Sequence, residues 1–455
     1  MKMNPQEIIY EHFITPLQKP RASYIGIEIE MPIVNLSGEK TEKYVCIDAV
    51  EKAISHFGFT PQKFDDNGVC HEAVCEDTSD VFSFDCSYNN FEISLGRVRT
   101  LHEAQARFRD YVSYINTELS QNNHTLTGIG INPNYKINDS NFVQSPRYSM
   151  LEGYLKKGKV WNGEFHPYYD FGTFSSASQV QLDVSEENLL KTIEAFSLVE
   201  PLKAVLFANS FLPDKPELLC ARDYLWENSP HGINPRNVGF FEPIPKSTDE
   251  LVSYLSKAGI FCAERDEKYL FFYPIPFDEY LDRDTVEAEY YDGEYHKYSF
   301  TPSADDIILL RTYKQIDLTS RGTLEFRSAC TQPLSEAMTA AAFHLGLINK
   351  TEELTELLKT SFIYGNGDSP AELRKKMNRA DFLSSVKADE LKSLLNDVLA
   401  LCSDGLKERG YAEGIYLRPL YHRAESLISP AKYLVEHQNQ INTVIKKYAE
   451  LEETL

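Results

Sequence analysis

Four segments of the chain alternate between apolar and polar residues, and this pattern restricts the fold more than any other feature. The segments are Ser23–Val34, Asn90–Leu95, Ser178–Ser185 and Thr323–Ala329. A period of two residues is typical of a β-strand with one buried face. The segments are separated by long, irregular stretches, and each is half polar rather than continuously apolar. Both properties favour a mostly antiparallel sheet over a parallel one.

Helical patterns lie between and after these segments. Leu101–Gln121 follows Thr100, a plausible N-cap. Glu186–Phe211 is also periodic, although its internal Pro201 is expected to break or kink a helix there. The first 100 residues are predicted to be mainly strands and loops. We therefore predict an α+β fold, with a mostly antiparallel sheet and flanking helices in residues 1–334 and a helical C-terminal region in residues 335–455, packed as one compact unit.

The charge balance excludes several classes of partner. The 455 residues include 68 Asp and Glu against 46 Lys and Arg, a formal net charge of −22. Such an acid excess argues against nucleic acid and against an anionic membrane surface. There is no apolar run of 18 residues, and the first residues do not resemble a signal peptide. The eight cysteines are therefore expected to be reduced thiols, and the expected location is cytoplasmic.

An acidic, tyrosine-rich stretch runs from Asp278 to Glu294. It holds eight acids and one base, Arg283. Runs of charge usually lie on solvated surface, so we predict a surface loop here.

The polar residues of the four predicted strands suggest a binding surface. Residues two apart on a strand project to the same side. A polar face can simply meet water, but here all four faces carry carboxylates, amides or an arginine. The sets are Glu28 and Glu30, then Asn90, Glu92 and Ser94, then Gln179, Gln181 and Asp183, and finally Glu325 and Arg327.

Several carboxylates on one concave surface need a compensating cation. Mg²⁺ is suited to this role because it prefers oxygen ligands and commonly holds substrate phosphates. Arg327, two residues from Glu325, is suited to charge that develops on a transferring phosphoryl group. The residues alone thus predict a Mg²⁺–nucleotide site on the inner face of a curved antiparallel sheet.

Other motifs are rejected. Gly153–Lys159 (GYLKKGK) matches part of a phosphate-binding loop, but Val160 follows where Ser or Thr is needed. Cys70, His71 and Cys75 have no second pair at zinc-finger spacing.

Several motifs together resemble one family in their order along the chain. They are Gly26–Glu30 (GIEIE), Asn89–Ser94 (NNFEIS), Pro146–Met150 (PRYSM), Ser178–Ser185 (SQVQLDVS), Arg222 and Trp226 followed by Asn234–Gly239 (NPRNVG), Arg321–Arg327 (RGTLEFR) and Gly405–Leu434. The family is the glutamate–cysteine ligases of plants and many bacteria. The resemblance implies a sheet curled into a funnel-shaped active site, as in the glutamine synthetase superfamily. It also implies ATP as cosubstrate, two or more Mg²⁺ ions, and phosphorylation of glutamate's γ-carboxylate before an amine attacks.

The resemblance also assigns roles to residues. It implies that Glu28, Glu30, Glu92 and Glu325 hold metal, with Glu30, Glu325 and Arg327 catalytic; that Arg321 and Arg327 contact nucleotide; and that Arg147, Gln179, Gln181, Arg222, Trp226 and Arg236 contact substrate. The partners expected are small molecules: ATP, glutamate, and cysteine or another amine.

Departures from the family pattern leave the amine open. Asn89-Asn90 replaces a glycine-containing turn, and Ser328-Ala329-Cys330 follows Arg327 where the family has another sequence. Cysteine is the default amine, and a different amine in a specialised pathway is the alternative. A catalytically silent nucleotide-binding protein is a further alternative, against which the intact acids argue. Asp183 is one candidate for the general base, although the sequence does not single one out.

Overall fold

The fold is built on a nine-stranded sheet. The computed structural model describes residues 4–19, 23–139, 142–161 and 165–452. Eight strands of the sheet follow the order β14-β15-β7-β1-β5-β4-β3-β2, with β6 paired to β1, and every pairing is antiparallel. The strands are β1 (Ile25–Asn35), β2 (Thr60–Phe64), β3 (Cys70–Val74), β4 (Val81–Phe84), β5 (Asn90–Val98), β6 (His124–Leu126), β7 (Ser178–Asp183), β14 (Ile316–Leu318) and β15 (Thr323–Phe326). The predicted α+β class with a mostly antiparallel sheet is confirmed.

The two faces of the central strands differ as the alternation predicted. On β1, Ile27 and Ile29 are buried beneath the helices, and their strand partners on β5 are Leu95 and Ile93. Glu28 and Glu30 project to the opposite side because side chains alternate along a strand. One face of the sheet therefore belongs to the apolar core, and the other is polar.

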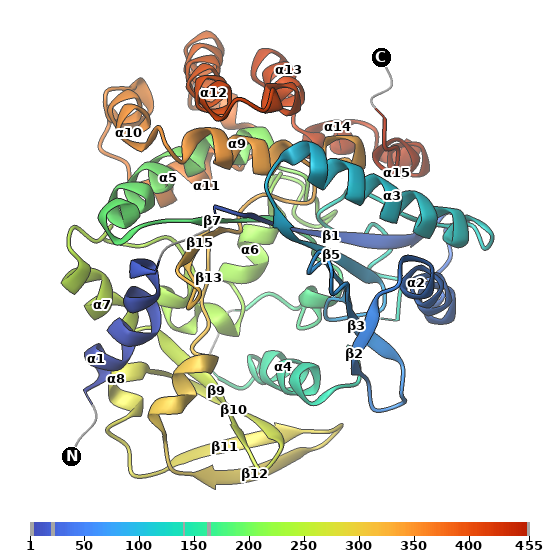
Figure 1. Ribbon diagram of the computed structural model, residues 1–455, viewed down its shortest axis with the longest axis vertical. Coiled ribbons are helices and arrows are strands. Elements are labelled where there is room, and N and C mark those ends of the chain that lie inside the picture. The colour runs from blue at the N-terminus through green and yellow to red at the C-terminus, as the bar shows by residue number, and fades with distance from the viewer. Residues whose placement is uncertain (1–3, 20–22, 140–141, 162–164, 453–455) are drawn as a thin grey trace.

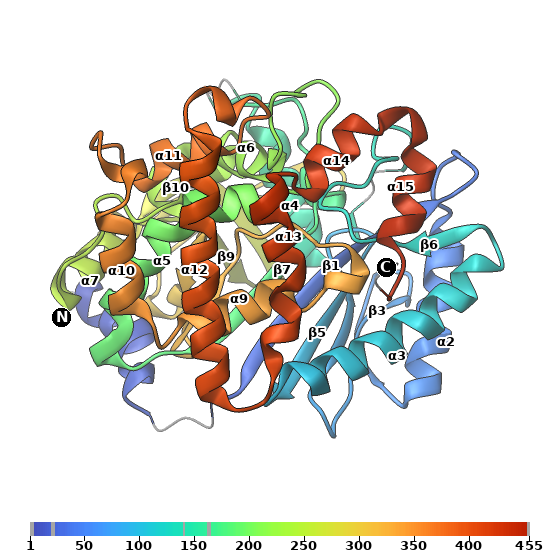
Figure 2. The ribbon, with the colours of Figure 1, turned by 90° about the horizontal axis from the view of Figure 1, so that it is seen from above.

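Helices cover the apolar face. Figures 1 and 2 show α3, α5, α9, α12 and α13 on one side of β1, β5 and β7. Thr100 caps α3 by accepting a hydrogen bond from the Glu103 backbone N–H, at 3.2 Å. Pro201 does not break α5, which continues to Phe207, so the expected break is wrong, while the kink stays a prediction. These helices are α3 (Leu101–Ser120), α5 (Glu186–Phe207), α9 (Thr339–Leu347), α10 (Thr351–Lys359), α11 (Pro370–Met377), α12 (Ala388–Arg409), α13 (Arg418–Ser426), α14 (Pro430–Glu436) and α15 (Ile441–Tyr448).

Two glycines set the distance between α9 and α12. A Cβ added at Gly405 would lie 1.8 Å from the Gly346 carbonyl oxygen, and one added at Gly346 would lie 2.4 Å from the Cys402 carbonyl oxygen. Only glycine allows the two helix backbones to approach so closely.

A four-stranded antiparallel sheet lies on the far side of the polar face, in the order β12-β11-β10-β9. Figure 1 shows it at the bottom of the molecule, with α4 between it and the larger sheet. A short parallel pair joins β8 and β13. The remaining strands and helices are β8 (Val238–Gly239), β9 (Gly259–Arg265), β10 (Lys268–Pro276), β11 (Val286–Tyr291), β12 (Tyr295–Phe300), β13 (Tyr313–Lys314), α1 (Pro5–Ile9), α2 (Lys43–Phe57), α4 (Pro146–Lys157), α6 (Ala221–Glu227), α7 (Thr248–Ser256) and α8 (Phe277–Tyr280).

Two expectations about secondary structure are wrong. The acidic stretch Asp278–Glu294 is not a loop throughout, because it includes the end of α8 and all of β11. Val286 and Ala288 are buried there, while Glu287 between them is exposed. The first 100 residues also include the 15-residue helix α2. Among the described residues, no helix is both long and apolar enough to cross a membrane.

Candidate active site

The polar face of the large sheet borders a cavity of about 890 Å³. The lining residues come from strands β1 to β5, β7 and β15 of the large sheet on one side and from α4, α6, β9, β10 and β13 on the other. Most of the predicted site residues line it together: Glu28, Glu30, Glu92, Arg147, Gln179, Arg222, Trp226, Arg321, Glu325 and Arg327. Gln181 and Arg236 are not part of this lining.

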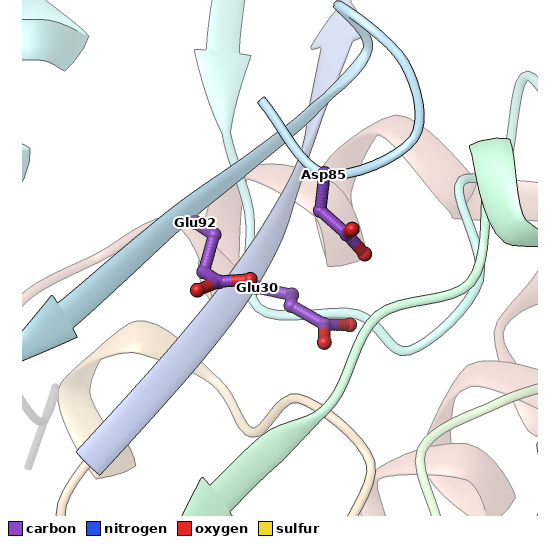
Figure 3. A group of neighbouring side chains, drawn as sticks. All are labelled: Glu30, Asp85 and Glu92. Carbon is purple, nitrogen blue, oxygen red and sulfur yellow. The ribbon is translucent and has the colours of Figure 1, made fainter. Parts of the chain in front are cut away.

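Three carboxylates form a compact cluster in the cavity. Glu30 on β1, Glu92 on β5 and Asp85 in the turn after β4 each offer an oxygen, and these oxygens lie within 4.8 Å of one another. Figure 3 shows the three side chains converging from separate segments. Glu30 and Glu92 are direct partners across the β1–β5 pair. Sequence reasoning missed Asp85, because β4 carries only a short alternating signal and Asp85 comes after it.

Burial makes the ionised forms of these carboxylates costly. It raises the pKa of Glu30 to about 8, with a further increase from the Asp85 charge. It raises the pKa of Glu28 to about 7, and Glu325 adds to the effect. The pKa of Glu92 is also well above its usual value, because of burial and the nearby charge of Glu28. A bound cation would reverse this cost, since opposite charge favours the ionised carboxylates.

Amide side chains orient the carboxylates. Gln179 donates from Nε2 to Glu30 Oε1 at 2.7 Å. Gln181 donates from Nε2 to Glu28 Oε1 at 2.7 Å and to Glu325 Oε1 at 3.1 Å. Gln181 Oε1 in turn accepts a hydrogen bond from Arg321 Nη2, at 2.6 Å. Gln181 therefore links two acids and an arginine of the site from the strand between them.

Arginines supply positive charge next to the acids. Arg327 Nη1 and Glu325 Oε2 are 2.8 Å apart. The carboxylates of Glu325 and Asp317 raise the pKa of Arg327, so its guanidinium stays charged. Arg222 is buried, and its Nη1 donates to the Ala329 carbonyl oxygen at 3.4 Å. Arg222 and Arg327 both line the cavity. The planar fork of each guanidinium matches the bidentate geometry of a carboxylate or a phosphate.

Aromatic rings form another part of the cavity lining. Trp226 stacks on Tyr313 with ring centroids 4.4 Å apart. His231 lies against the same tyrosine at 4.2 Å and also lines the cavity. Burial lowers the pKa of His231 to about 3, so its imidazole is neutral. No sequence motif pointed to His231, because a single histidine in a short 3-10 helix carries no spacing signal.

Arg236 is not where the family resemblance implied. Its guanidinium lies over the Tyr254 ring, 5.3 Å from the centroid. Asp183, the suggested general base, also does not line the cavity; it ends β7, opposite Thr323 of β15. Contact of Arg236 or Asp183 with substrate stays a prediction, and the positions of both residues outside the cavity lining do not favour it.

The cluster of Glu30, Asp85 and Glu92 fits a hard divalent cation. All three donors are carboxylate oxygens, the ligand type that Mg²⁺ prefers. The like charges of Glu30 and Glu92 face each other directly across two strands, an arrangement that is unfavourable unless a cation lies nearby. Among the described residues this is the one group of three or more acids, histidines or cysteines whose ligand atoms converge in this way.

Comparison with known proteins places these features in a family context. A model of the family described as glutamate-cysteine ligase family 2 matches residues 24–369, more than half of the chain. The chloroplastic glutamate–cysteine ligase of Arabidopsis thaliana is 25% identical over 363 residues, covering 77% of this chain and 64% of that protein. The chloroplastic enzyme of Brassica juncea is 25% identical over 364 residues, covering 77% and 65%. The chain thus spans less than two-thirds of the length of these relatives.

A solved structure extends the comparison to the fold. The crystal structure of a glutamate–cysteine ligase from Francisella tularensis in complex with AMP superposes with a TM-score of 0.50. The two chains are 10% identical, and the superposition covers 95% of this chain and 89% of the other. At this level of identity the likeness shows a shared fold.

Proposed function

We propose, since the chain belongs to glutamate-cysteine ligase family 2, that it is an ATP-dependent ligase. It joins the γ-carboxylate of glutamate to an amine and releases ADP and phosphate. Cysteine is the proposed amine, because the plant relatives are named as glutamate–cysteine ligases. The product would then be γ-glutamylcysteine, formed through a γ-glutamyl phosphate.

One observation carries the proposal. The acid cluster of Glu30, Asp85 and Glu92 and the ion pair of Glu325 with Arg327 line the same cavity. A carboxylate is a poor electrophile until it is phosphorylated, and phosphoryl transfer depends mainly on positioning and charge stabilisation. This cavity brings together the acids that bind cations and the arginines that bind anions.

The acidic and the basic residues of the cavity have different proposed roles. Glu30, Asp85 and Glu92 would hold Mg²⁺, which when bound shields the phosphate charges of ATP and polarises the transferring group. Gln179 keeps Glu30 oriented through its 2.7 Å hydrogen bond. Arg327 would stabilise negative charge on the transferring phosphoryl group.

The test is amine-dependent ADP release by two variants. We expect Glu30→Gln and Glu325→Gln to lower the rate at least about 100-fold, the usual scale for losing a charged group that stabilises a transition state. Glu436→Gln, on the exposed end of α14, is the control and should keep the wild-type rate. Full activity in both active-site variants would remove the assigned metal and phosphate roles.

A different amine is the second candidate, and one observation favours it. Arg236, which the family pattern assigns to substrate, packs on Tyr254 instead of lining the cavity. Arg236 is thus placed outside the cavity that would hold the substrate, which leaves room for an amine other than cysteine. Mass spectrometry of products formed from ATP, glutamate and a mixture of amino acids would identify the amine, and absence of a cysteine product beside another product would favour this alternative.

A further inference from the structure

His231 is a buried polar side chain that lines the cavity without a hydrogen-bond partner. It has no exposed surface, and neither Nδ1 nor Nε2 has a partner among the described residues. A buried unpaired polar atom costs about 1–3 kcal/mol. Such a cost is acceptable at a binding site, where a ligand supplies the missing partner.

The backbone around His231 is held in place. His231 N–H donates to Ser229 Oγ at 3.3 Å at the start of a short 3-10 helix, Pro230–Ile233. The Tyr154 hydroxyl donates to the Pro230 carbonyl oxygen at 2.9 Å. The backbone that carries the imidazole is therefore fixed beside the cavity that His231 lines.

Aromatic rings surround the imidazole. The ring centroids of Tyr154, Trp226 and Phe261 lie 5.2, 5.3 and 5.2 Å from that of His231. Tyr313 is nearer, at 4.2 Å. These neighbours present mostly ring carbon, so the surroundings favour a ligand group that is neutral and partly apolar.

The position of His231 relates it to the proposed chemistry. The Arg327 guanidinium lies 6.0 Å from the centroid of the Tyr313 ring, and the centroid of the His231 ring lies 4.2 Å from the same point. His231 and the arginine assigned to phosphoryl transfer thus lie beside one ring. A group bound to His231 would therefore lie in the same part of the cavity as that arginine.

The chemistry of a neutral imidazole narrows the choice of ligand. It carries one N–H donor and one acceptor nitrogen, so it can pair with a group that both donates and accepts. Carboxylates and phosphates on a ligand bind more strongly to the nearby arginines, and ammonium groups bind more strongly to the acids of the sheet. Of the neutral side-chain groups that both donate and accept, a thiol or a hydroxyl is smaller and less polar than a carboxamide, so it suits the apolar rings around the imidazole better.

We propose that His231 is a specificity-determining residue of the proposed ligase, and that its imidazole hydrogen-bonds the thiol or hydroxyl on the side chain of the amine substrate. The proposal rests on the function proposed above. It names the chemical class of the amine as a small amino acid whose side chain ends in S–H or O–H.

The test compares cysteine with 2-aminobutyrate, which has a methyl group where cysteine has its thiol. We expect the wild type to favour cysteine in kcat/KM by about 10-fold or more, the scale of one buried hydrogen bond. His231→Phe keeps an aromatic ring and should bring the ratio close to one, mainly by raising the KM for cysteine. His231→Gln restores a donor and an acceptor and should recover a preference for cysteine.

His344 supplies the matched control. It is also buried and packs on Phe196 and Phe326, and its Nε2 likewise lacks a partner among the described residues. It does not line the cavity. His344→Phe should therefore leave the ratio of the two amines at the wild-type value, even where it lowers stability.

Two results separate failure of this inference from failure of the proposed function. If the wild type converts an amine but His231→Phe keeps the wild-type preference between cysteine and 2-aminobutyrate, the role of His231 is overturned. If the wild type forms no product with any amine, the proposed function is overturned. Calorimetric titration of both amines into the wild type and His231→Phe then decides the role of His231, because equal binding preferences in the two proteins contradict it.

Discussion

At the level of single residues, the cost of the site is concentrated in Glu30 and Glu92. These carboxylates are direct partners on adjacent strands, and burial raises the pKa of both. Like charges directly opposite each other destabilise a sheet. The two residues thus lower the stability of the metal-free chain, and the same closeness of their charges suits them to bind a cation.

Replacing one of these two carboxylates should raise the stability of the metal-free chain and weaken cation binding. We expect Glu92→Gln to raise the free energy of unfolding of the metal-free chain by about 1 kcal/mol, since a raised pKa reports an unfavourable ionised form. The same variant should lose the stabilisation that Mg²⁺ with ATP gives the wild type. Thermal unfolding with and without Mg²⁺–ATP measures both effects. A variant that is less stable than the wild type without metal would contradict the assigned repulsion.

Acid sensitivity is a second property that belongs to one residue. Burial lowers the pKa of His231 from its usual value near 6.5 to about 3. Between these values the unfolded chain binds a proton that the folded chain does not, so folding stability falls as the pH decreases from about 6.5 towards 3. We expect His231→Phe to lose less stability over this range, by up to about 1.4 kcal/mol per pH unit. Urea unfolding at pH 7, 6 and 5 measures the slopes, and equal slopes in the two proteins would contradict the neutral imidazole.

At the level of elements, the contact of α9 with α12 depends on two glycines. An added methyl group at Gly405 would overlap the Gly346 carbonyl oxygen at 1.8 Å. Alanine favours a helix by about 1 kcal/mol over glycine, but overpacking costs about 1–3 kcal/mol or more. We expect Gly405→Ala to destabilise the protein by about 2 kcal/mol. Gly414→Ala is the control, because its added Cβ meets only Ser403 Oγ, at 4.0 Å; chemical denaturation of both variants gives the comparison.

The elements that sequence predicts well are those with a clear period. The four alternating segments became β1, β5, β7 and β15, since burial on one face enforces the period. Thr100 marked the start of α3. The strand β11 was missed because its charges outweighed the buried Val286 and Ala288. Pro201 was misjudged because tertiary packing in α5 outweighs its local cost.

At the level of the whole molecule, the site joins segments that are far apart in the chain. β1 and β15 are separated by nearly 300 residues, yet both flank β7. Sequence reasoning placed Glu28, Glu30, Glu92 and Glu325 on one polar face, and they line one cavity, whereas Asp183 of the same face does not line it. It did not find Asp85 or His231, which lie in a turn and a short 3-10 helix, where no period exists to reveal which way a side chain points.

Binding of nucleotide and cation should stabilise the whole chain. A ligand at 100 times its Kd adds about 2.7 kcal/mol to the free energy of unfolding. We therefore expect ATP with Mg²⁺ to raise the Tm, and a chelator to abolish the rise, because the acid cluster needs a cation before it can meet phosphate. An equal rise with ATP in the presence of chelator would mean that nucleotide binds without the acids. Adenosine without metal is the control for contacts to the base and ribose alone.

The two-sided strands also limit how the gene can change in length. On β1, the residues that face the cavity and those that face the helices alternate one by one. Deleting or inserting one codon within such a strand would exchange the two sets beyond that point, placing glutamates among buried rings and isoleucines in the cavity. Insertions and deletions should therefore be tolerated in the connecting loops. Related genes should differ in length in those loops, while each of the four site strands keeps the same number of residues.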